Sequence, residues 1–213
     1  MRRQLFDSSE QSKAGARLAR TEGSEDRMIT WFVQLPVWTL VRVLGIGSFL
    51  SLSAGMVIGI MYGYPQMKGK KKAQLHRYHT YLNNAGTALA LLHAVLLIID
   101  TFMPFDWHEI LVPFTAEHNP VLNGIGTVAL YGLLLVLLTT DLRQKLRRKL
   151  WLTLHMLSYP IFVLALIHGL MLGTDRHLGI VQAMYTAAVL ALIAATAGRY
   201  VSMRCEKRRK GLY

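Results

Sequence analysis

The chain of 213 residues is 53% hydrophobic, carries a formal net charge of +12 and contains one cysteine, Cys205. Its apolar residues gather in runs of about 20 or more, the length that a helix needs to cross roughly 30 Å of hydrocarbon. The basic residues fall mostly in short loops between these runs, so the charge reflects membrane topology and argues against nucleic-acid binding. A lone cysteine excludes an intrachain disulfide.

The first 36 residues differ in composition from the rest of the chain. Residues 1–27 are polar, with six basic and five acidic residues, and we expect them to be disordered because they have too few apolar side chains to form a core. They lack the apolar region of a secretory signal peptide, and the change of character at Met28 raises the hypothesis that they precede the true start. Residues 28–36, MITWFVQLP, are aromatic and are expected to lie at the membrane interface.

Residues 37–201 are predicted to form an all-α membrane bundle of about five helices, followed by a basic tail at 202–213. Proline 160 falls inside the fourth apolar run and should kink or unwind that helix locally. Gly55 and Gly59 give the first run a GxxxG spacing that lets another helix approach closely. The predicted spans cover residues 37–62, 75–102, 121–140, 149–175 and 178–201.

The charges of the predicted loops alternate along the chain. The loops after spans one and three and the tail after span five are basic, whereas the connection 103–120 has three acids and no Lys or Arg. Basic loops tend to stay in the cytoplasm, so the pattern predicts an N-out, C-in orientation. Spans two and four then run parallel to each other.

Each of these two parallel spans carries two histidines, which are costly in hydrocarbon and normally functional. His79 and His93 are 14 residues apart, about 21 Å along a helix and ~40° around it. His155 and His168 are 13 residues apart, and an ideal helix would place them ~140° apart, which does not favour a shared face. The expected kink at Pro160 would absorb part of that mismatch.

Matched depth favours two levels of paired imidazoles, His79 with His155 and His93 with His168. Two neutral imidazoles can fill both axial positions of a haem iron, and two such haems would carry electrons across the membrane. Hydrogen-bonded packing histidines remain the alternative. A zinc site is disfavoured because each level offers two nitrogens and no Cys or carboxylate, and a proton path would need an acid deep in a span.

The remaining candidates are less specific. His76 lies three residues before His79 and competes with it as the inner ligand. Arg42 near the outer end of span one either extends its side chain to the interface or pairs with a haem propionate. Three histidines belong to the predicted outer connections, where solvation is the default: His108, His118 and His177.

At these residues the sequence resembles the ferric reductase-like transmembrane domain family, which includes the membrane portions of ferric reductases and NADPH oxidases. The likeness covers about residues 37–200 and implies two b-type haems, held by His79 with His155 and by His93 with His168. The matching segments are WTLVRVLGIGSFL, YHTYLNNAGTALALLHAVLLIID, GIGTVALYGLLLVLLTTDLR and LWLTLHMLSYPIFVLALIHGLMLGTD.

The expected function is therefore transmembrane electron transfer by a haem-containing oxidoreductase component of the bacterial cytoplasmic membrane. The sequence has no GxGxxG-like fingerprint, so no flavin or nicotinamide site is expected in this chain. Electrons would enter from a separate flavin-containing reductase or from a membrane quinol and leave to an extracytoplasmic acceptor. Two alternatives stay open: a quinol-linked haem subunit that serves an extracytoplasmic reductase, and a helical scaffold or transporter without a redox centre.

Overall fold

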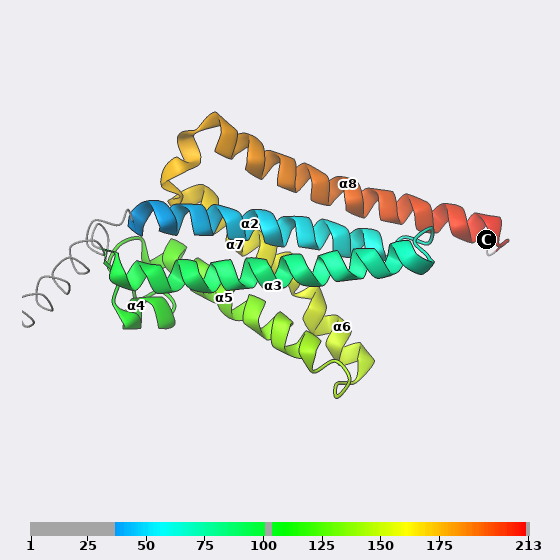
Figure 1. Cartoon of the computed structure of the whole chain (residues 1–213), viewed down its shortest axis with the longest axis horizontal. Helices are drawn as coiled ribbons and strands as arrows, with labels where there is room; N and C mark the ends of the chain where they lie inside the picture. Colours follow the sequence, from blue (N-terminus) through cyan, green and yellow to red (C-terminus); the bar gives the residue numbers. More distant parts are fainter. Residues whose placement is uncertain (1–36, 101–103, 212–213) are drawn as a thin grey trace, which may run out of the picture. The chain divides into compact units, whose positions relative to one another are not determined.

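The computed structural model describes residues 37–100 and 104–211, and none of them lies in a β-strand. The predicted tail 1–27, the predicted interfacial segment 28–36 and the last residues of the predicted second span fall outside this part of the chain. The elements, shown in Figure 1, are α2 (Val37–Tyr62), α3 (Gly69–Ile99), α4 (Trp107–Leu111), α5 (Pro120–Asp141), α6 (Arg148–Met156), α7 (Ser158–Leu172), the 3₁₀ helix η1 (Thr174–His177) and α8 (Gly179–Arg209).

Five helical segments of the described chain are long and apolar enough to cross a membrane: α2, α3, α5, α6 with α7, and α8. Large apolar side chains are exposed on these helices, among them Val43, Leu92 and Leu138, each more than half exposed. Such exposure is unfavourable in water but not in contact with lipid tails, which are as apolar as leucine. The predicted all-α fold with five candidate spans is confirmed, and it is consistent with a multi-pass membrane protein.

Two helices extend beyond the apolar runs that predict them. Helix α3 begins at Gly69, within the lysine-rich segment, and α8 continues through the basic tail to Arg209. Lysine and arginine are good helix formers, so the helices do not stop where the apolar residues stop. Hydropathy thus marks where a span meets water, and it does not mark where its helix ends.

The fourth span is interrupted, as Pro160 predicts. Helix α6 ends at Met156 and α7 begins at Ser158, with a tighter turn in which the Leu157 N–H donates to the Leu154 oxygen at 3.1 Å. Proline has no N–H to offer the carbonyl four residues earlier, which is that of Met156. This interruption lies between the two histidines of the span, so the angle of an ideal helix does not describe how they are related.

Helices α2 and α3 lie side by side and run in opposite directions (Figure 1). The hydroxyl groups of Ser48 and Ser51 donate to the Gly86 and Leu82 carbonyls across this interface, each at 2.9 Å. Both glycines of the GxxxG pair also face α3, since a Cβ at Gly55 would come within 2.7 Å of the Asn83 side chain. The small residues of α2 therefore let α3 approach closely, as the spacing predicts. Helix α5 packs most extensively on α7.

A small aromatic core joins α2, α7 and α8. The ring of Phe49 lies 5.5 Å from that of Phe162 and 4.8 Å from that of Tyr185, centre to centre. All three side chains are buried, together with Val181. Near the middle of α8, the Tyr64 hydroxyl donates to the Ala195 carbonyl at 2.8 Å.

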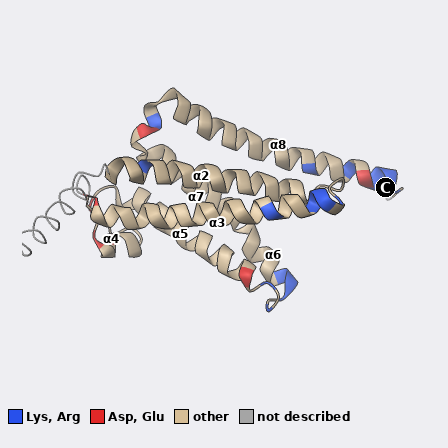
Figure 2. Ribbon diagram, viewed as in Figure 1, with Lys and Arg blue, Asp and Glu red and all other residues tan. Residues whose placement is uncertain are grey.

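Charged side chains are segregated along the helices. Figure 2 shows the basic residues of the α3 start, of the α5–α6 connection and of the α8 end at one end of the helices. The acidic residues of the connection that contains α4 and of the connection between α7 and α8 lie at the opposite end. The three basic segments that are separate in sequence therefore share one end.

Candidate functional site

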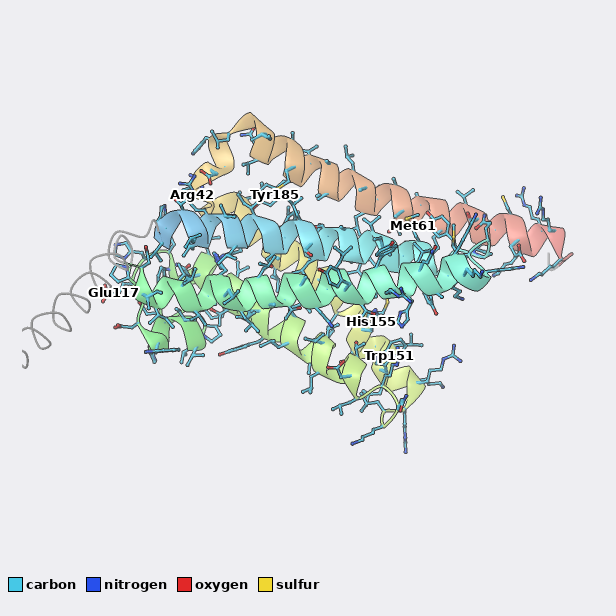
Figure 3. The ribbon with its side chains drawn as sticks, viewed as in Figure 1. Arg42, Met61, Glu117, Trp151, His155 and Tyr185 are labelled. Atoms are coloured by element: carbon cyan, nitrogen blue, oxygen red, sulfur yellow. The ribbon has the colours of Figure 1, made fainter. Side chains whose placement is uncertain are left out.

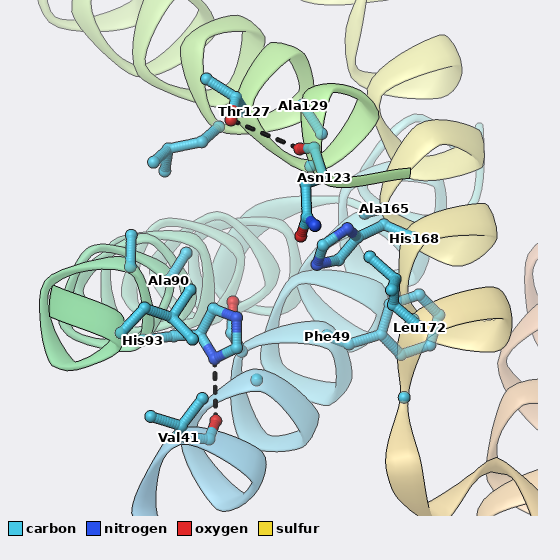
Figure 4. A pocket seen from close by; sticks show the side chains of 18 of the residues that line it. Val41, Phe49, Ala90, His93, Asn123, Thr127, Ala129, Ala165, His168 and Leu172 are labelled. Atoms are coloured by element: carbon cyan, nitrogen blue, oxygen red, sulfur yellow. Dashed lines mark hydrogen bonds between the residues drawn. The ribbon is translucent and has the colours of Figure 1, made fainter. Parts of the chain in front are cut away.

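One cavity of about 310 Å³ lies among helices α2, α3, α5 and α7, with Tyr185 of α8 in its wall. Its volume is at the lower end of the range for small-molecule and cofactor sites, and its lining is largely apolar. His93 of α3 and His168 of α7 both line it and reach it from different helices (Figure 4). We call these two residues the cavity pair.

Both imidazoles of the cavity pair are held by backbone carbonyls. The Nδ1–H of His93 donates to the Val41 oxygen at 2.8 Å, and that of His168 donates to the Leu122 oxygen at 2.9 Å. A carbonyl can only accept, so the hydrogen of each neutral ring lies on Nδ1 and the Nε2 lone pair stays free. This is the state in which a histidine binds a metal, with its second nitrogen orienting the ring.

The other two predicted ligands, His79 and His155, form a second pair further along the helices. Their ring centres are 6.2 Å apart and the rings are inclined at 70°. An imidazole nitrogen lies about 2 Å from a bound metal, so two rings on opposite sides of one ion have centres roughly 6 Å apart. The spacing of the second pair therefore fits two axial ligands. His79 is also oriented, because its Nδ1–H donates to the Gly55 oxygen at 2.7 Å.

His155 differs from the other three histidines. Its ring stacks on Trp151 with centres 5.3 Å apart and planes inclined at 24°; Figure 3 labels both side chains. The His155 Nδ1 and the Trp151 Nε1 are buried, and neither has a hydrogen-bond partner among the described residues. Within the described part of the chain, no hydrogen bond at Nδ1 fixes the tautomer of His155.

Of His76 and His79, the two candidates for the inner position, only His79 lies beside His155. The exposed ring of His76 lies against Tyr62, with centres 5.6 Å apart, whereas His79 is the residue beside His155. His108, His118 and His177 are exposed in the connections, as expected, although His118 also lines the cavity.

Arg42 has a partner that the sequence analysis missed. Its Nε donates to Oδ2 of Asp175 at 2.7 Å, and its Nη2 contacts Oδ1 of the same carboxylate. Both residues line the cavity, and the pair joins the start of α2 to η1. A signal was available, because Arg42 is the one basic residue well inside a predicted span and Asp175 ends another. Neither expected role of Arg42, interfacial or propionate-binding, included this partner.

Glu109 organises the connection between α3 and α5 and also lines the cavity. Its carboxylate accepts the Glu117 N–H at 2.7 Å and the Asp106 N–H at 2.9 Å. These two hydrogen bonds, that from Glu117 first, hold the pKa of the Glu109 carboxyl below its usual value. The carboxylate therefore stays ionised and keeps this connection folded over the cavity.

Two glycines in contact with the cavity pair also escaped the sequence analysis. A Cβ at Gly45 would lie 3.1 Å from the His93 Nδ1, and one at Gly126 would lie 2.6 Å from the His168 Nδ1. The signal was the tripeptide Gly-Ile-Gly, which occurs at 45–47 and again at 124–126. Sequence alone gave no reason to connect these repeats with histidines on other helices.

No group of three or more His, Cys, Asp or Glu side chains suited to a metal ion occurs in the described ranges. The histidines are instead grouped in twos. Comparison with protein-family models, with curated proteins and with solved structures finds no match to the chain. The likeness to the ferric reductase-like transmembrane family therefore rests on the sequence motifs.

Proposed function

We propose that the chain is a membrane haem protein whose function is electron transfer across the bilayer, as the membrane component of a ferric reductase-like oxidoreductase. His93 with His168, and His79 with His155, would hold two b-type haems. Haem iron with two axial imidazoles supplies reversible one-electron chemistry without a free position for oxygen.

The observation that carries the proposal is the cavity pair. Two histidines from different helices line one largely apolar cavity, and each has its Nδ1–H committed to a carbonyl and its Nε2 lone pair free. A packing histidine needs a hydrogen bond but has no need of a cavity shared with a second histidine that is hydrogen-bonded in the same way. The 6.2 Å spacing of the second pair supports a second site of the same kind.

The residues around the cavity suit a buried, low-polarity redox centre. The apolar walls exclude water, and the backbone hydrogen bonds hold both rings in fixed orientations. At one end of the cavity, Arg42 and Asp175 neutralise each other, so this pair adds no net charge there. Arg42 would also be in place to contact a propionate.

The electron donor would act at the basic end of the helices. We propose that this end faces the cytoplasm, because basic segments that are far apart in sequence gather there (Figure 2). A positive surface suits an acidic flavin-containing reductase, and the bilayer offers quinol as the other donor. The acceptor would then be extracytoplasmic, at the end that carries Glu109 and Asp175.

The test is the haem content of the detergent-purified full chain, with a reduced-minus-oxidised absorption spectrum. We expect about two low-spin b-type haems per chain in the unaltered protein. His93→Ala and His168→Ala should each remove one of them, because an iron held by two imidazoles loses half of its axial ligation. His76→Ala is the matched control and should leave both haems, since its ring lies against Tyr62.

Two outcomes would contradict the proposal. A colourless protein from haem-replete cells would leave the chain as a scaffold or transporter with packing histidines. Equal haem loss in His76→Ala and His168→Ala, with unchanged folding by circular dichroism, would show that the cavity pair is not the ligand pair.

A further inference from the structure

Three of the four candidate ligands share one local arrangement that their sequence spacing does not reveal. Each donates its Nδ1–H to a helix carbonyl that lies four residues before a glycine, and each ring lies against that glycine. The three units are His93 with Val41 and Gly45, His79 with Gly55 and Gly59, and His168 with Leu122 and Gly126.

The glycine is needed because the ring occupies the space of a side chain. A Cβ at Gly59 would lie 2.7 Å from the His79 ring, and one at Gly126 would lie 2.6 Å from the His168 ring. Real Cβ atoms do not approach other atoms so closely, so alanine would push the ring away from its carbonyl. At Gly59 and Gly126 the missing side chain leaves the carbonyl four residues earlier open to a ring from the neighbouring helix, and at Gly45 a Cβ would make a tighter than usual contact of 3.1 Å with the His93 ring.

The register of these units repeats on α2. His79 and His93 are 14 residues apart on α3, and Gly59 and Gly45 are likewise 14 apart on the antiparallel α2. The two helices thus carry the same unit twice, once for each pair of histidines.

The corresponding repeat is absent on α5, which packs on α6 and α7. His155 precedes His168 by 13 residues, so a matching glycine for His155 is expected 13 or 14 residues after Gly126. These two positions are Thr139 and Thr140 instead of glycine. Their hydroxyl groups donate to the Leu135 and Val136 oxygens at 2.8 Å and 2.7 Å, which are the carbonyls four residues earlier. These carbonyls are already used, and the His155 Nδ1 has no partner among the described residues.

We infer that Gly45, Gly59 and Gly126 are positioning residues for three histidine ligands, and that His155 is a loosely held fourth. The second pair should therefore bind its haem more weakly than the cavity pair. Second-sphere partners of metal-bound histidines typically change metal affinity by 10- to 100-fold, which sets the size expected here. This inference rests on the proposed haem function and names the residues that tune each site.

The first experiment compares Gly126→Ala with Gly132→Ala in the full chain. Both glycines lie on α5, and a Cβ at either would be about equally crowded, but at Gly132 it meets Ile161 at 2.7 Å and no histidine. We expect Gly126→Ala to weaken haem binding at one site by roughly 10- to 100-fold in a haem titration of the apoprotein. The electron paramagnetic resonance signal of that haem should shift, because its ligand ring has turned.

Gly132→Ala should leave both the affinity and the resonance signal unchanged even where it lowers the unfolding temperature. On α2, Gly59→Ala should repeat the effect at the other site, with Gly47→Ala as its control because a Cβ there makes only an ordinary 3.6 Å contact. Equal haem loss in Gly126→Ala and Gly132→Ala would overturn the positioning role and leave general packing. An unaltered protein without haem would instead overturn the proposed function.

The second experiment measures haem release to an excess of a soluble haem-capturing protein. His79→Ala retains only the cavity pair, and His93→Ala retains only the second pair. Release from His93→Ala should be roughly 10- to 100-fold faster, because the Nδ1 of His155, one of its two remaining ligands, has no hydrogen bond to a described residue. Equal rates, or slower release from His93→Ala, would contradict the loose attachment of His155.

Discussion

The cavity pair and the second pair contain the same residue types but are supported differently. His93 and His168 each donate to a backbone carbonyl and line one cavity. Phe49 and Tyr185, which contact each other, also line that cavity. In the second pair, His79 is held in the same manner, whereas His155 stacks on Trp151 with an unpartnered Nδ1. The histidines alone do not distinguish the two pairs; their surroundings do.

In this fold, a histidine ring is preorganised by its hydrogen bond and by the glycine against which it packs. A ring that is hydrogen-bonded and packed against a glycine has one orientation before any cofactor arrives, so binding does not have to order it. A stacked ring without a hydrogen bond retains more freedom. Three mutational tests, from the largest expected effect to the smallest, probe this difference.

The first test changes one aromatic neighbour of each pair. Phe49→Ala should lower the free energy of unfolding by about 3 kcal/mol, because it removes a buried ring that contacts both Phe162 and Tyr185. Trp151→Phe should cost less than about 1 kcal/mol, since it removes an indole N–H that is buried without a partner. Chemical denaturation in detergent measures both values.

Leu138→Ala, at a side chain that is 57% exposed, is the control for the loss of apolar volume without loss of internal contacts. A cost for Trp151→Phe as large as that for Phe49→Ala would show that the Trp151 indole is held as firmly as the Phe49 ring and would contradict the weaker support of the second pair.

The second test concerns the ion pair beside the cavity. Arg42→Gln and Asp175→Asn, singly and together, form a double-mutant cycle whose coupling free energy should be about 1–2 kcal/mol, because the Asp175 carboxylate is largely shielded and accepts a charged hydrogen bond. The exposed Glu206–Lys210 pair at the end of α8 provides the comparison and should give a smaller coupling, because water screens both charges.

Thermal unfolding at low and high salt checks both cycles. Only the coupling between Glu206 and Lys210 should weaken strongly with salt. A coupling for Arg42 and Asp175 no larger than that of the α8 pair would show that they do not fasten η1 to α2.

The third and smallest effect involves Glu109 in the connection above the cavity. Its lowered pKa means that its contribution is fully present above the usual pKa of a glutamate and is lost as the pH falls through the lowered value. Glu109→Gln should speed amide hydrogen exchange of Asp106 and Glu117 roughly three- to tenfold at neutral pH, because a neutral acceptor binds these N–H groups less strongly.

Hydrogen-exchange mass spectrometry of the loop peptides measures this change, with peptides around His155 as the internal reference. After correction for the intrinsic exchange rate, acidification should reduce protection in the unaltered chain and leave Glu109→Gln nearly unchanged. Equal sensitivity of both proteins to acid would assign the effect to another group.

The sequence determined the features that depend on short stretches of chain. The length of the apolar runs predicted the number of spans, since about 20 apolar residues are required to cross the hydrocarbon. Pro160 predicted the interruption between α6 and α7, because the missing N–H is a property of that one residue. The four histidines could be selected because an imidazole in an apolar run is costly wherever the run is packed.

Only the tertiary structure decided what each of these residues touches. Arg42 and Asp175 are 133 residues apart, and His168 and Leu122 are 46 apart, so no local pattern connects them. The same holds for Gly126, whose role depends on which ring arrives from the facing helix. The sequence alone determines which side chains are costly to bury. Helix packing determines which carbonyl, charge or glycine each of them contacts, because these contacts depend on the rotation and depth of one helix against another.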